Sequence, residues 1–247
     1  MEIFSECKLC LHGLTVYNPN DMYVGKAFQL YGEFSQLEID LILPMLARDA
    51  VVLDIGANIG ALTVPMARHC RDGIVLAIEP QPVQFQFLCA NIVLNSLMNA
   101  RPVNAAVGSR QSQMRVPFLD PRVPNNFGGL DIRREGDGPM VSCVTVDSMG
   151  LSKCDFIKVD VEGMEEDVLR GAVETISRFS PLLWVESDRK EFQESLFNFL
   201  EGLGYFKTQM FTPLFNPDNY LGNPVNVWPA IVSENFLFHK SDRMDIS

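Results

Sequence analysis

Residues 51–60 read Val-Val-Leu-Asp-Ile-Gly-Ala-Asn-Ile-Gly, and this stretch decides the fold of the chain. A β-branched run ends in Asp54, passes through Gly56 and Gly60, and opens an amphipathic stretch that starts at Ala61. This order predicts a buried strand, a tight turn and a helix N-terminus, which together open a nucleotide-binding α/β sheet. The alternative interpretation is an ordinary strand–helix turn in which Asn58 caps the helix.

The acid in this turn narrows the choice of ligand. A pyrophosphate binds to glycine amides that have no carboxylate beside them, whereas Asp54 places negative charge where the ligand is expected. The turn therefore favours a nucleoside that carries positive charge. S-adenosylmethionine, with its ammonium and sulfonium groups, fits this requirement best.

The composition predicts a single globular domain over residues 1–247. A chain of 247 residues, 47% hydrophobic and 21% charged, can bury a substantial core. Its net charge of -11 argues against a nucleic-acid surface. No segment has the length and apolarity of a membrane span, and residues 1–6 lack the order of a signal peptide, so we expect a cytoplasmic protein. The cysteines are expected to be reduced, and Cys7 and Cys10 have no second pair that would complete a zinc site.

The first 48 residues are expected to form a helical lid and substrate segment. Within it, Ser35-Gln36-Leu37-Glu38 has the spacing of a capping box and predicts a helix that Pro44 kinks or ends. The catalytic core then spans residues 50–247. It contains an insertion at about 110–140, which we expect to be a hairpin of strands 113–119 and 140–146 with a mobile loop that contacts the substrate.

Strand and helix patterns alternate through the rest of the core. We expect strands at 51–55, 74–79, 102–108, 155–160 and 182–186, and a final strand pair at 205–211 and 235–239. Helices are expected through 85–94, at 165–178, and at 188–204, where Asp188 and Glu191 have capping-box spacing. This order predicts an α/β fold with a doubly wound, mostly parallel sheet that binds its ligands at the carboxyl ends of the strands.

Four acids stand at the predicted strand ends, and we expect a single cleft to collect them: Asp54, Glu79, Asp160 and Glu186. Glu79 lies about twenty residues after the glycine turn, the position of the acid that binds ribose hydroxyls in dinucleotide folds. Its alternative role is an acid at a helix N-terminus before Pro80.

The segment after residue 155 suggests a polar centre in this cleft. Lys158 and Asp160 share a strand face, which predicts an ion pair, because a buried lysine is costly without one. Asp160 is the best candidate for reaching the transferred group, and Glu162 is next, although Glu162 is also suited to starting a helix.

Several blocks of the sequence resemble class I S-adenosylmethionine-dependent methyltransferases: residues 54–60, Ile78-Glu79-Pro80 and Asn104-Ala105-Ala106-Val107-Gly108. Residues 145–147, 157–165 (Ile-Lys-Val-Asp-Val-Glu-Gly-Met-Glu) and 168–171 are similar to the FkbM family within that class. The resemblance covers roughly residues 50–187. It implies a Rossmann-like sheet of seven strands, the last antiparallel, and methyl transfer that is typically to a hydroxyl oxygen.

The resemblance also implies roles for individual residues. The methionine part of the cofactor is expected at Asp54, Gly56, Asn58 and Gly60, its ribose at Glu79, and its adenine beside Ala106 and Val107. Asp160 and Glu162 are expected to line the methyl-transfer site.

An alcohol acceptor needs a general base within hydrogen-bond reach. His69 is expected at the end of a surface helix and His239 at the end of the last strand, so we expect a carboxylate as the base, Asp160 ahead of Glu186. The alternative base is His12, if the N-terminal segment folds over the cleft. We assign no metal site, with a divalent cation held by these acids as the alternative.

The acceptor is expected to be a hydroxyl of a small molecule, sugar or lipid. The lid and the insertion would select it, with contacts from Phe118, Asn125, Asn126 and Phe127. The alternative functions are a nicotinamide-dependent oxidoreductase, which the glycine spacing disfavours, a nucleic-acid methyltransferase, which the net charge disfavours, and a non-catalytic binding module on the same fold.

Overall fold

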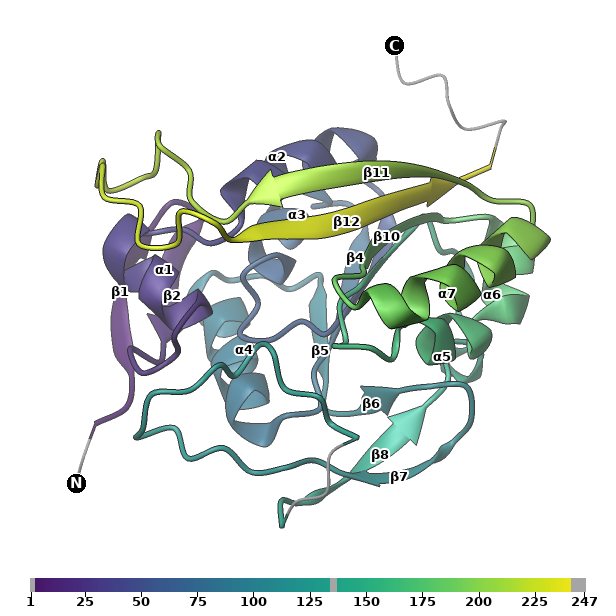
Figure 1. Cartoon of the computed structure of the whole chain (residues 1–247), viewed down its shortest axis with the longest axis horizontal. Helices are drawn as coiled ribbons and strands as arrows, with labels where there is room; N and C mark the ends of the chain where they lie inside the picture. Colours follow the sequence, from purple (N-terminus) through teal and green to yellow (C-terminus); the bar gives the residue numbers. More distant parts are fainter. Residues whose placement is uncertain (1–2, 134–136, 241–247) are drawn as a thin grey trace.

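A seven-stranded sheet forms the centre of the computed structural model, which describes residues 3–133 and 137–240 (Figure 1). The strand order is β11-β12-β10-β9-β3-β4-β5. The strands are β3 (Val51–Ile55), β4 (Ile74–Ile78), β5 (Ala100–Val103), β9 (Phe156–Val159), β10 (Leu182–Glu186), β11 (Phe206–Pro213) and β12 (Val232–His239). All neighbours are parallel except β12, which is antiparallel to both β10 and β11. The predicted mostly parallel sheet with an antiparallel last strand is confirmed.

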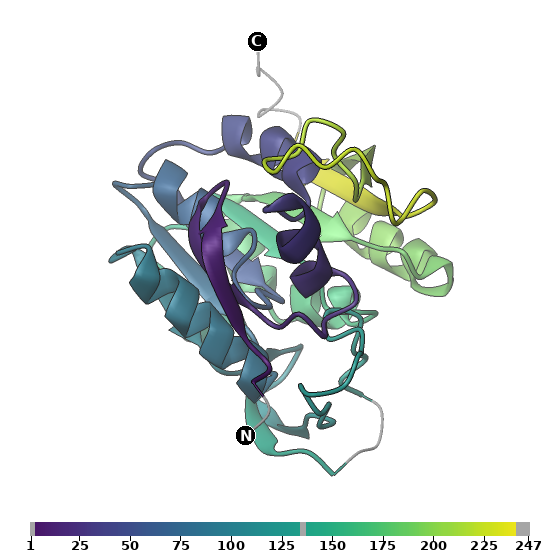
Figure 2. The ribbon, with the colours of Figure 1, turned by 90° about the vertical axis from the view of Figure 1, so that its left-hand side faces the viewer.

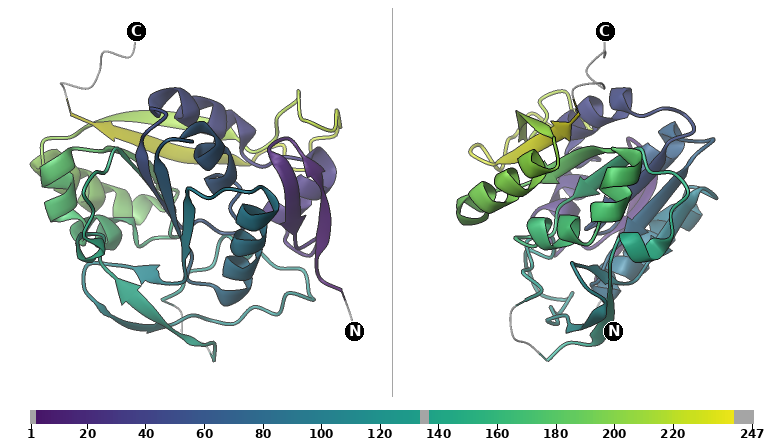
Figure 3. Two further views of the ribbon diagram at one scale, coloured as in Figure 1. Left: turned by 180° about the vertical axis from the view of Figure 1, so that it is seen from behind. Right: turned by 90° about the vertical axis from the view of Figure 1, so that its right-hand side faces the viewer.

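Helices cover both faces of this sheet, which explains why its central strands are apolar on both sides. One face packs against α2 (Gln36–Ile42), α3 (Thr63–His69) and α4 (Pro82–Leu94), seen from behind in Figure 3. The other face packs against α5 (Glu165–Arg170), α6 (Val173–Phe179) and α7 (Lys190–Gly202). The carboxyl edge between these two layers is the place where a ligand can enter.

The N-terminal segment is more than a helical lid. It begins with a hairpin of β1 (Glu6–Cys10) and β2 (Gly13–Tyr17), followed by α1 (Val24–Tyr31). Figure 2 shows α1 beside the 214–231 loop that joins β11 to β12, and the Tyr31 hydroxyl donates to the Val225 carbonyl at 2.8 Å. Pro44 lies in a 3-10 turn, η1 (Leu43–Met45), so α2 ends early as predicted.

Neither predicted capping box forms. Ser35 adopts a left-handed conformation with φ 48° and makes no side-chain cap, because the Glu38 carboxylate instead binds the buried Trp184 indole. Asp188 accepts a hydrogen bond from the Glu234 amide, so α7 begins after Arg189 without a side-chain cap. In both places a long-range partner replaces the local contact that the spacing suggested.

Two expected elements are divided. The 102–108 strand ends at Val103, and β6 (Ala106–Val107) joins a separate sheet with β7 (Ser112–Arg115) and β8 (Met140–Val144). The antiparallel β7–β8 pair confirms the predicted inserted hairpin, but its strands end at Arg115 and Val144 and not at 119 and 146. Residues 134–136 of the loop that was expected to be mobile lie outside the described residues. The 165–178 helix breaks between α5 and α6, where Gly171 packs so closely on Gly108 that a Cβ atom would lie 2.1 Å from its carbonyl oxygen. The 3-10 turn η2 (Asp147–Met149) precedes β9.

None of the helices in the described ranges has the length and apolar character needed to cross a membrane.

Candidate functional site

A cavity of about 400 Å³ opens at the carboxyl edge of the central sheet. Its floor comes from the segments that follow β3, β4, β9 and β10, and its walls come from α1, α2, the insertion and the 214–231 loop. Six of the predicted site residues line it: Gly56, Asn58, Glu79, Asp160, Glu162 and Glu186. Three of the four strand-end acids that were expected to meet at one cleft therefore line this cavity, and the fourth, Asp54, does not.

The other predicted residues lie outside the cavity lining. Asp54 is fully buried beneath the turn, and Gly60 packs against Leu88 at the start of the α3 segment. Ala106 and Val107 are buried in β6, where they pair with β8. They belong to the separate sheet β6-β8-β7 and not to the central strand β5, and neither of them lines the cavity.

The turn after β3 has a backbone that tolerates little change. The amides of Gly56 and Ala57 both donate to the Ile78 carbonyl at 3.0 Å. Gly56 has φ +80°, and a Cβ atom there would lie 1.8 Å from the Asp160 carbonyl oxygen. Asn58, with φ 51°, donates its amide to Glu79 Oε2 at 2.8 Å, and helix α3 begins only at Thr63. Asn58 is therefore not a helix cap.

Replacing Gly56 by alanine tests this close approach. Gly150→Ala is the matched control, because Gly150 also has positive φ (+63°) but no atom within 4 Å of its virtual Cβ. We expect the control to lose about 1 kcal/mol of unfolding free energy from backbone strain alone. Gly56→Ala should lose about 3 kcal/mol or more, because the collision is with backbone. Urea titrations of both variants give these values, and equal losses would contradict the prediction.

Lys158 lies at the centre of the site and contacts the turn after β3 and two carboxylates. Asp54, Lys158 and Trp184 are register partners on β3, β9 and β10, so their side chains share one face of the sheet. Lys158 Nζ donates to the Gly56 carbonyl at 3.1 Å and lies 3.2 Å from Asp160 Oδ2 and 3.5 Å from Asp54 Oδ1. Burial opposes the charged amine, but these carboxylates outweigh burial and raise the pKa of Lys158. The predicted ion pair with Asp160 is confirmed, and Asp54 is a second partner.

Glu38 is a cavity residue that the sequence did not reveal. It comes from α2, and its Oε1 accepts a hydrogen bond from Trp184 Nε1 at 2.8 Å. Burial raises the pKa of its carboxyl to about 7. Its spacing from Ser35 suggested a local cap, and no local pattern pairs it with a tryptophan 146 residues away.

The remaining acids differ in how fully they are bound. Glu79 accepts backbone hydrogen bonds at both oxygens, from the amides of Asn58 and Gln81, each at 2.8 Å, while burial raises its pKa to about 7. Glu162 is bound by Arg189, and burial raises its pKa to about 7 as well. The carboxyl group of Glu186 has no hydrogen bond or ion pair within the described part of the chain, and burial, followed by the nearby charge of Asp160, raises its pKa well above the usual range. Glu186 is therefore the cavity acid that is free to meet a ligand.

Apolar or neutral side chains form most of the cavity walls that come from α1, the insertion and the 214–231 loop. Of the four residues expected to contact the acceptor, Asn126 lines the cavity and Phe118, Asn125 and Phe127 do not. Phe127 is buried, while its carbonyl accepts a hydrogen bond from Gln81 Nε2 at 2.8 Å. Tyr23, Phe34, Leu214 and Ile231 supply apolar contacts from other elements. None of the three histidines lines the cavity, and no group of three or more potential metal ligands is found within the described residues.

The sequence was compared with protein families and with known proteins, and both comparisons found similar methyltransferases or related transferases. The sequence pattern of the methyltransferase FkbM domain matches residues 54–207. An aminocarboxypropyltransferase acting on tRNA(Phe), from Methanocaldococcus jannaschii, is 44% identical over 55 residues, which are 22% of each chain. "Methyltransferase 1" from Beauveria bassiana is 26% identical over 178 residues, covering 61% of this chain and 71% of its own. These matches thus span between about a fifth and about seven tenths of the relatives' length.

Among solved structures, the methyltransferase FkbM from Methylobacillus flagellatus KT superimposes with a TM-score of 0.55. The two chains share 19% identity, and the superposition covers 78% of this chain and 44% of the other. At this identity the likeness concerns the fold alone.

Proposed function

The chain belongs to the FkbM methyltransferase family, and we propose that it methylates a hydroxyl oxygen of a small molecule, sugar or lipid. S-adenosylmethionine is the methyl donor. Membership of a methyltransferase family also favours methyl transfer over the nicotinamide-dependent oxidoreductase, which was the alternative interpretation of the glycine turn. The identity of the acceptor atom and the roles of the individual residues are parts of the proposal.

The residues of the cavity suit this cofactor. Asn58 Oδ1 is buried without a hydrogen-bond partner among the described residues, so it is available to accept from the cofactor's ammonium group. Glu79 directly follows the carboxyl end of β4 and lines the cavity, which supports its role as the acceptor of hydrogen bonds from the ribose hydroxyls. Lys158 is the one basic side chain in the described lining, against six acids, and this balance favours a cationic ligand. Asp54 acts indirectly, by holding Lys158 under the turn.

The observation that carries the proposed mechanism is the free carboxylate of Glu186. When bound, the cofactor supplies an electrophilic methyl group, so the protein must align the acceptor, exclude water and take up one proton. Asp160 is engaged by Lys158, whereas Glu186 has no partner in the described chain. We therefore place Glu186 ahead of Asp160 as the general base, with Glu162 and Asp160 orienting the acceptor.

The same cavity favours a small acceptor over a nucleic acid. Phosphate backbones bind through basic surfaces, and this chain has a net charge of -11 and an acidic cavity. The apolar side chains of Phe34, Leu214 and Ile231 suit the carbon skeleton of a small organic acceptor.

Label transfer tests the proposal directly. The protein is incubated with S-adenosylmethionine carrying a ¹³C-methyl group and a metabolite extract, and products are separated and their methyl resonances recorded. We expect the label on oxygen. Label on nitrogen or carbon would contradict O-methylation. Bound cofactor with no transfer into any fraction would favour the non-catalytic alternative.

A further inference from the structure

Part of the insertion lies directly over the cavity. Residues 121–133, here called the cover, contribute five lining residues: Asn126, Gly128, Gly129, Leu130 and Ile132. The cover also approaches the turn after β3, where the cofactor is proposed to bind, because a Cβ atom on Gly128 would lie 3.1 Å from Asn58 Nδ2. A ligand bound at that turn is therefore enclosed by the cover.

Neutral hydrogen bonds attach the first half of the cover. The Pro121 carbonyl accepts from Asn18 Nδ2 at 2.9 Å and from Asn20 Nδ2 at 3.0 Å. The Phe127 carbonyl accepts from Gln81 Nε2 at 2.8 Å. Both contacts involve the cover backbone, so they fix its path and carry no charge.

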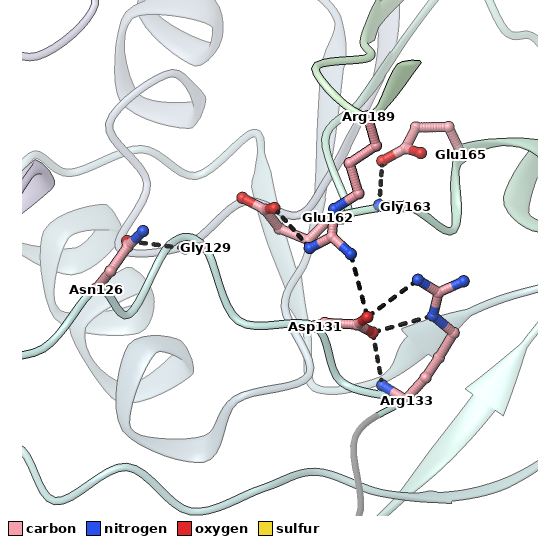
Figure 4. Close-up of polar contacts among 8 residues, drawn as sticks. All are labelled: Asn126, Gly129, Asp131, Arg133, Glu162, Gly163, Glu165 and Arg189. Atoms are coloured by element: carbon pink, nitrogen blue, oxygen red, sulfur yellow. Dashed lines mark hydrogen bonds and ion pairs between the residues drawn. The ribbon is translucent and has the colours of Figure 1, made fainter. Parts of the chain in front are cut away.

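The second half is attached through charges. The Arg189 guanidinium lies between Asp131 of the cover and Glu162 of the cavity floor (Figure 4). Its two terminal nitrogens are 3.1 Å from Asp131 Oδ2 and 3.1 Å from Glu162 Oε2. Asp131 also accepts from the Arg133 side chain at 3.0 Å. A planar guanidinium can serve two carboxylates at once, which a lysine ammonium does less well.

Glycine makes room for this arrangement. Gly163 follows Glu162 with φ +98°, and a Cβ atom there would lie 3.1 Å from Arg189 Cδ and 2.8 Å from an Arg133 nitrogen. The Arg133 guanidinium is also 5.4 Å from the Phe192 ring centre. Both guanidinium groups thus pack over the loop that carries Glu162.

The four charged side chains at this contact form two ion pairs, one within the cover and one within the floor. Asp131 and Arg133 both belong to the cover, and Glu162 and Arg189 both belong to the floor. Separating cover from floor breaks the Arg189–Asp131 contact and leaves each charge with a partner. Opening therefore avoids the large cost of an unpaired buried charge. The side chains of Arg189 and Asp131 are 28% and 14% exposed, so the contact is less screened than a surface pair.

We propose that Arg189 is a positioning residue that latches the cover over bound cofactor and holds Glu162 in the acceptor site. This inference rests on the proposed function, since it assigns the enclosed ligand to S-adenosylmethionine. The latch slows cofactor dissociation, and its ionic character makes that rate sensitive to salt.

The test measures cofactor dissociation by stopped-flow displacement in the full chain. We expect Arg189→Gln to speed dissociation about tenfold, and Arg189→Lys, which keeps the charge, to fall between it and the wild type. Salt should speed dissociation from the wild type more than from Arg189→Gln. Arg170→Gln is the charge-matched control, because Arg170 pairs with Glu166 on the surface of α5 and lies outside the cavity lining. It should leave the rate unchanged.

A second variant separates the latch from a folding defect. Asp131→Asn breaks the same contact from the cover side and should speed dissociation similarly, while the double variant should add little, because both changes remove one contact. Circular dichroism melting checks that each variant is folded. Unchanged dissociation in folded Arg189→Gln or Asp131→Asn overturns the latch. Failure of the wild type to bind the cofactor instead overturns the proposed function.

Discussion

Replacing Glu79 by glutamine is expected to weaken S-adenosylmethionine binding by about 100-fold or more. Hydrogen bonds to a charged group are each worth about 1.5–3 kcal/mol, and about 1.4 kcal/mol corresponds to tenfold in affinity. Both Glu79 oxygens already accept backbone amides, so the glutamine NH₂ must face a donor, either the Asn58 or the Gln81 amide. The variant loses a charged acceptor for the ribose and also disturbs the turn. Isothermal titration calorimetry measures the change.

The affinity should also depend on pH. Burial raises the pKa of Glu79 to about 7, so in the free protein this carboxyl becomes increasingly protonated as the pH falls below 7. The ribose hydroxyls need the ionised form as acceptor, and binding must then release the proton. The dissociation constant should therefore rise as the pH falls from 8 to 5.5, by up to about tenfold per unit below the pKa. The Glu79→Gln variant should lose this component of the dependence.

Asp147→Asn provides the control for turn stability. Asp147 also accepts two backbone amides, those of Glu174 and Thr175, but it lies outside the cavity lining. This variant is expected to lose some unfolding free energy and to keep its cofactor affinity. If Glu79→Gln binds the cofactor as tightly as Asp147→Asn does, the ribose role of Glu79 is wrong.

The local pattern of the chain predicts the frame of the site well. The strand, turn and helix around residues 51–60 are specified by neighbours in sequence, because β-branched residues, an acid and two glycines leave few other backbone conformations. The period of two also predicts the Lys158–Asp160 pair, since both residues lie on one strand face. Strand-end acids then meet because parallel strands end at one edge.

Contacts between distant segments are what the pattern does not predict. Glu38 meets Trp184 across 146 residues, and Arg189 meets Asp131 across 58. For Glu38 the sequence suggested a local alternative, the capping box with Ser35, whereas no local pattern pointed to the Arg189–Asp131 contact. Glu38 binds the Trp184 indole in place of that cap, because a buried indole N–H without a partner costs more than a lost helix cap. Asp54, which the sequence predicts in the cavity, lies instead below the turn, because its register partner Lys158 pairs with it there.

Replacing Glu186 by glutamine should lower kcat by about 100- to 10,000-fold, the range expected for loss of a general base. The acceptor is the one found by label transfer, and the rate is measured in single turnovers at saturating cofactor. Cofactor affinity should remain close to that of the wild type, because the cofactor contacts proposed above come from Asn58 and Glu79. A large loss in kcat without a loss in binding is the signature of a group that acts on the acceptor proton.

The pH profile provides an independent readout. Burial raises the pKa of Glu186 well above the usual range, so at low pH the carboxyl is protonated and cannot accept the acceptor's proton. The wild-type kcat should therefore rise about tenfold per pH unit until the pH passes this pKa, and then level off. In Glu186→Gln that rise should disappear, whereas Glu186→Asp should keep a rising profile at a lower rate.

Asp188→Asn is the matched control for Glu186→Gln. Asp188 also lines the cavity, but its Oδ1 is occupied by the Glu234 amide at 3.0 Å, so we expect at most a small change in kcat. Asp160→Asn addresses the competing assignment, because Asp160 is ion-paired with Lys158. If Asp160→Asn abolishes the pH dependence and Glu186→Gln retains it, the base is Asp160. The two carboxylates lie at the ends of neighbouring parallel strands, so the base is decided by which of them Lys158 already holds.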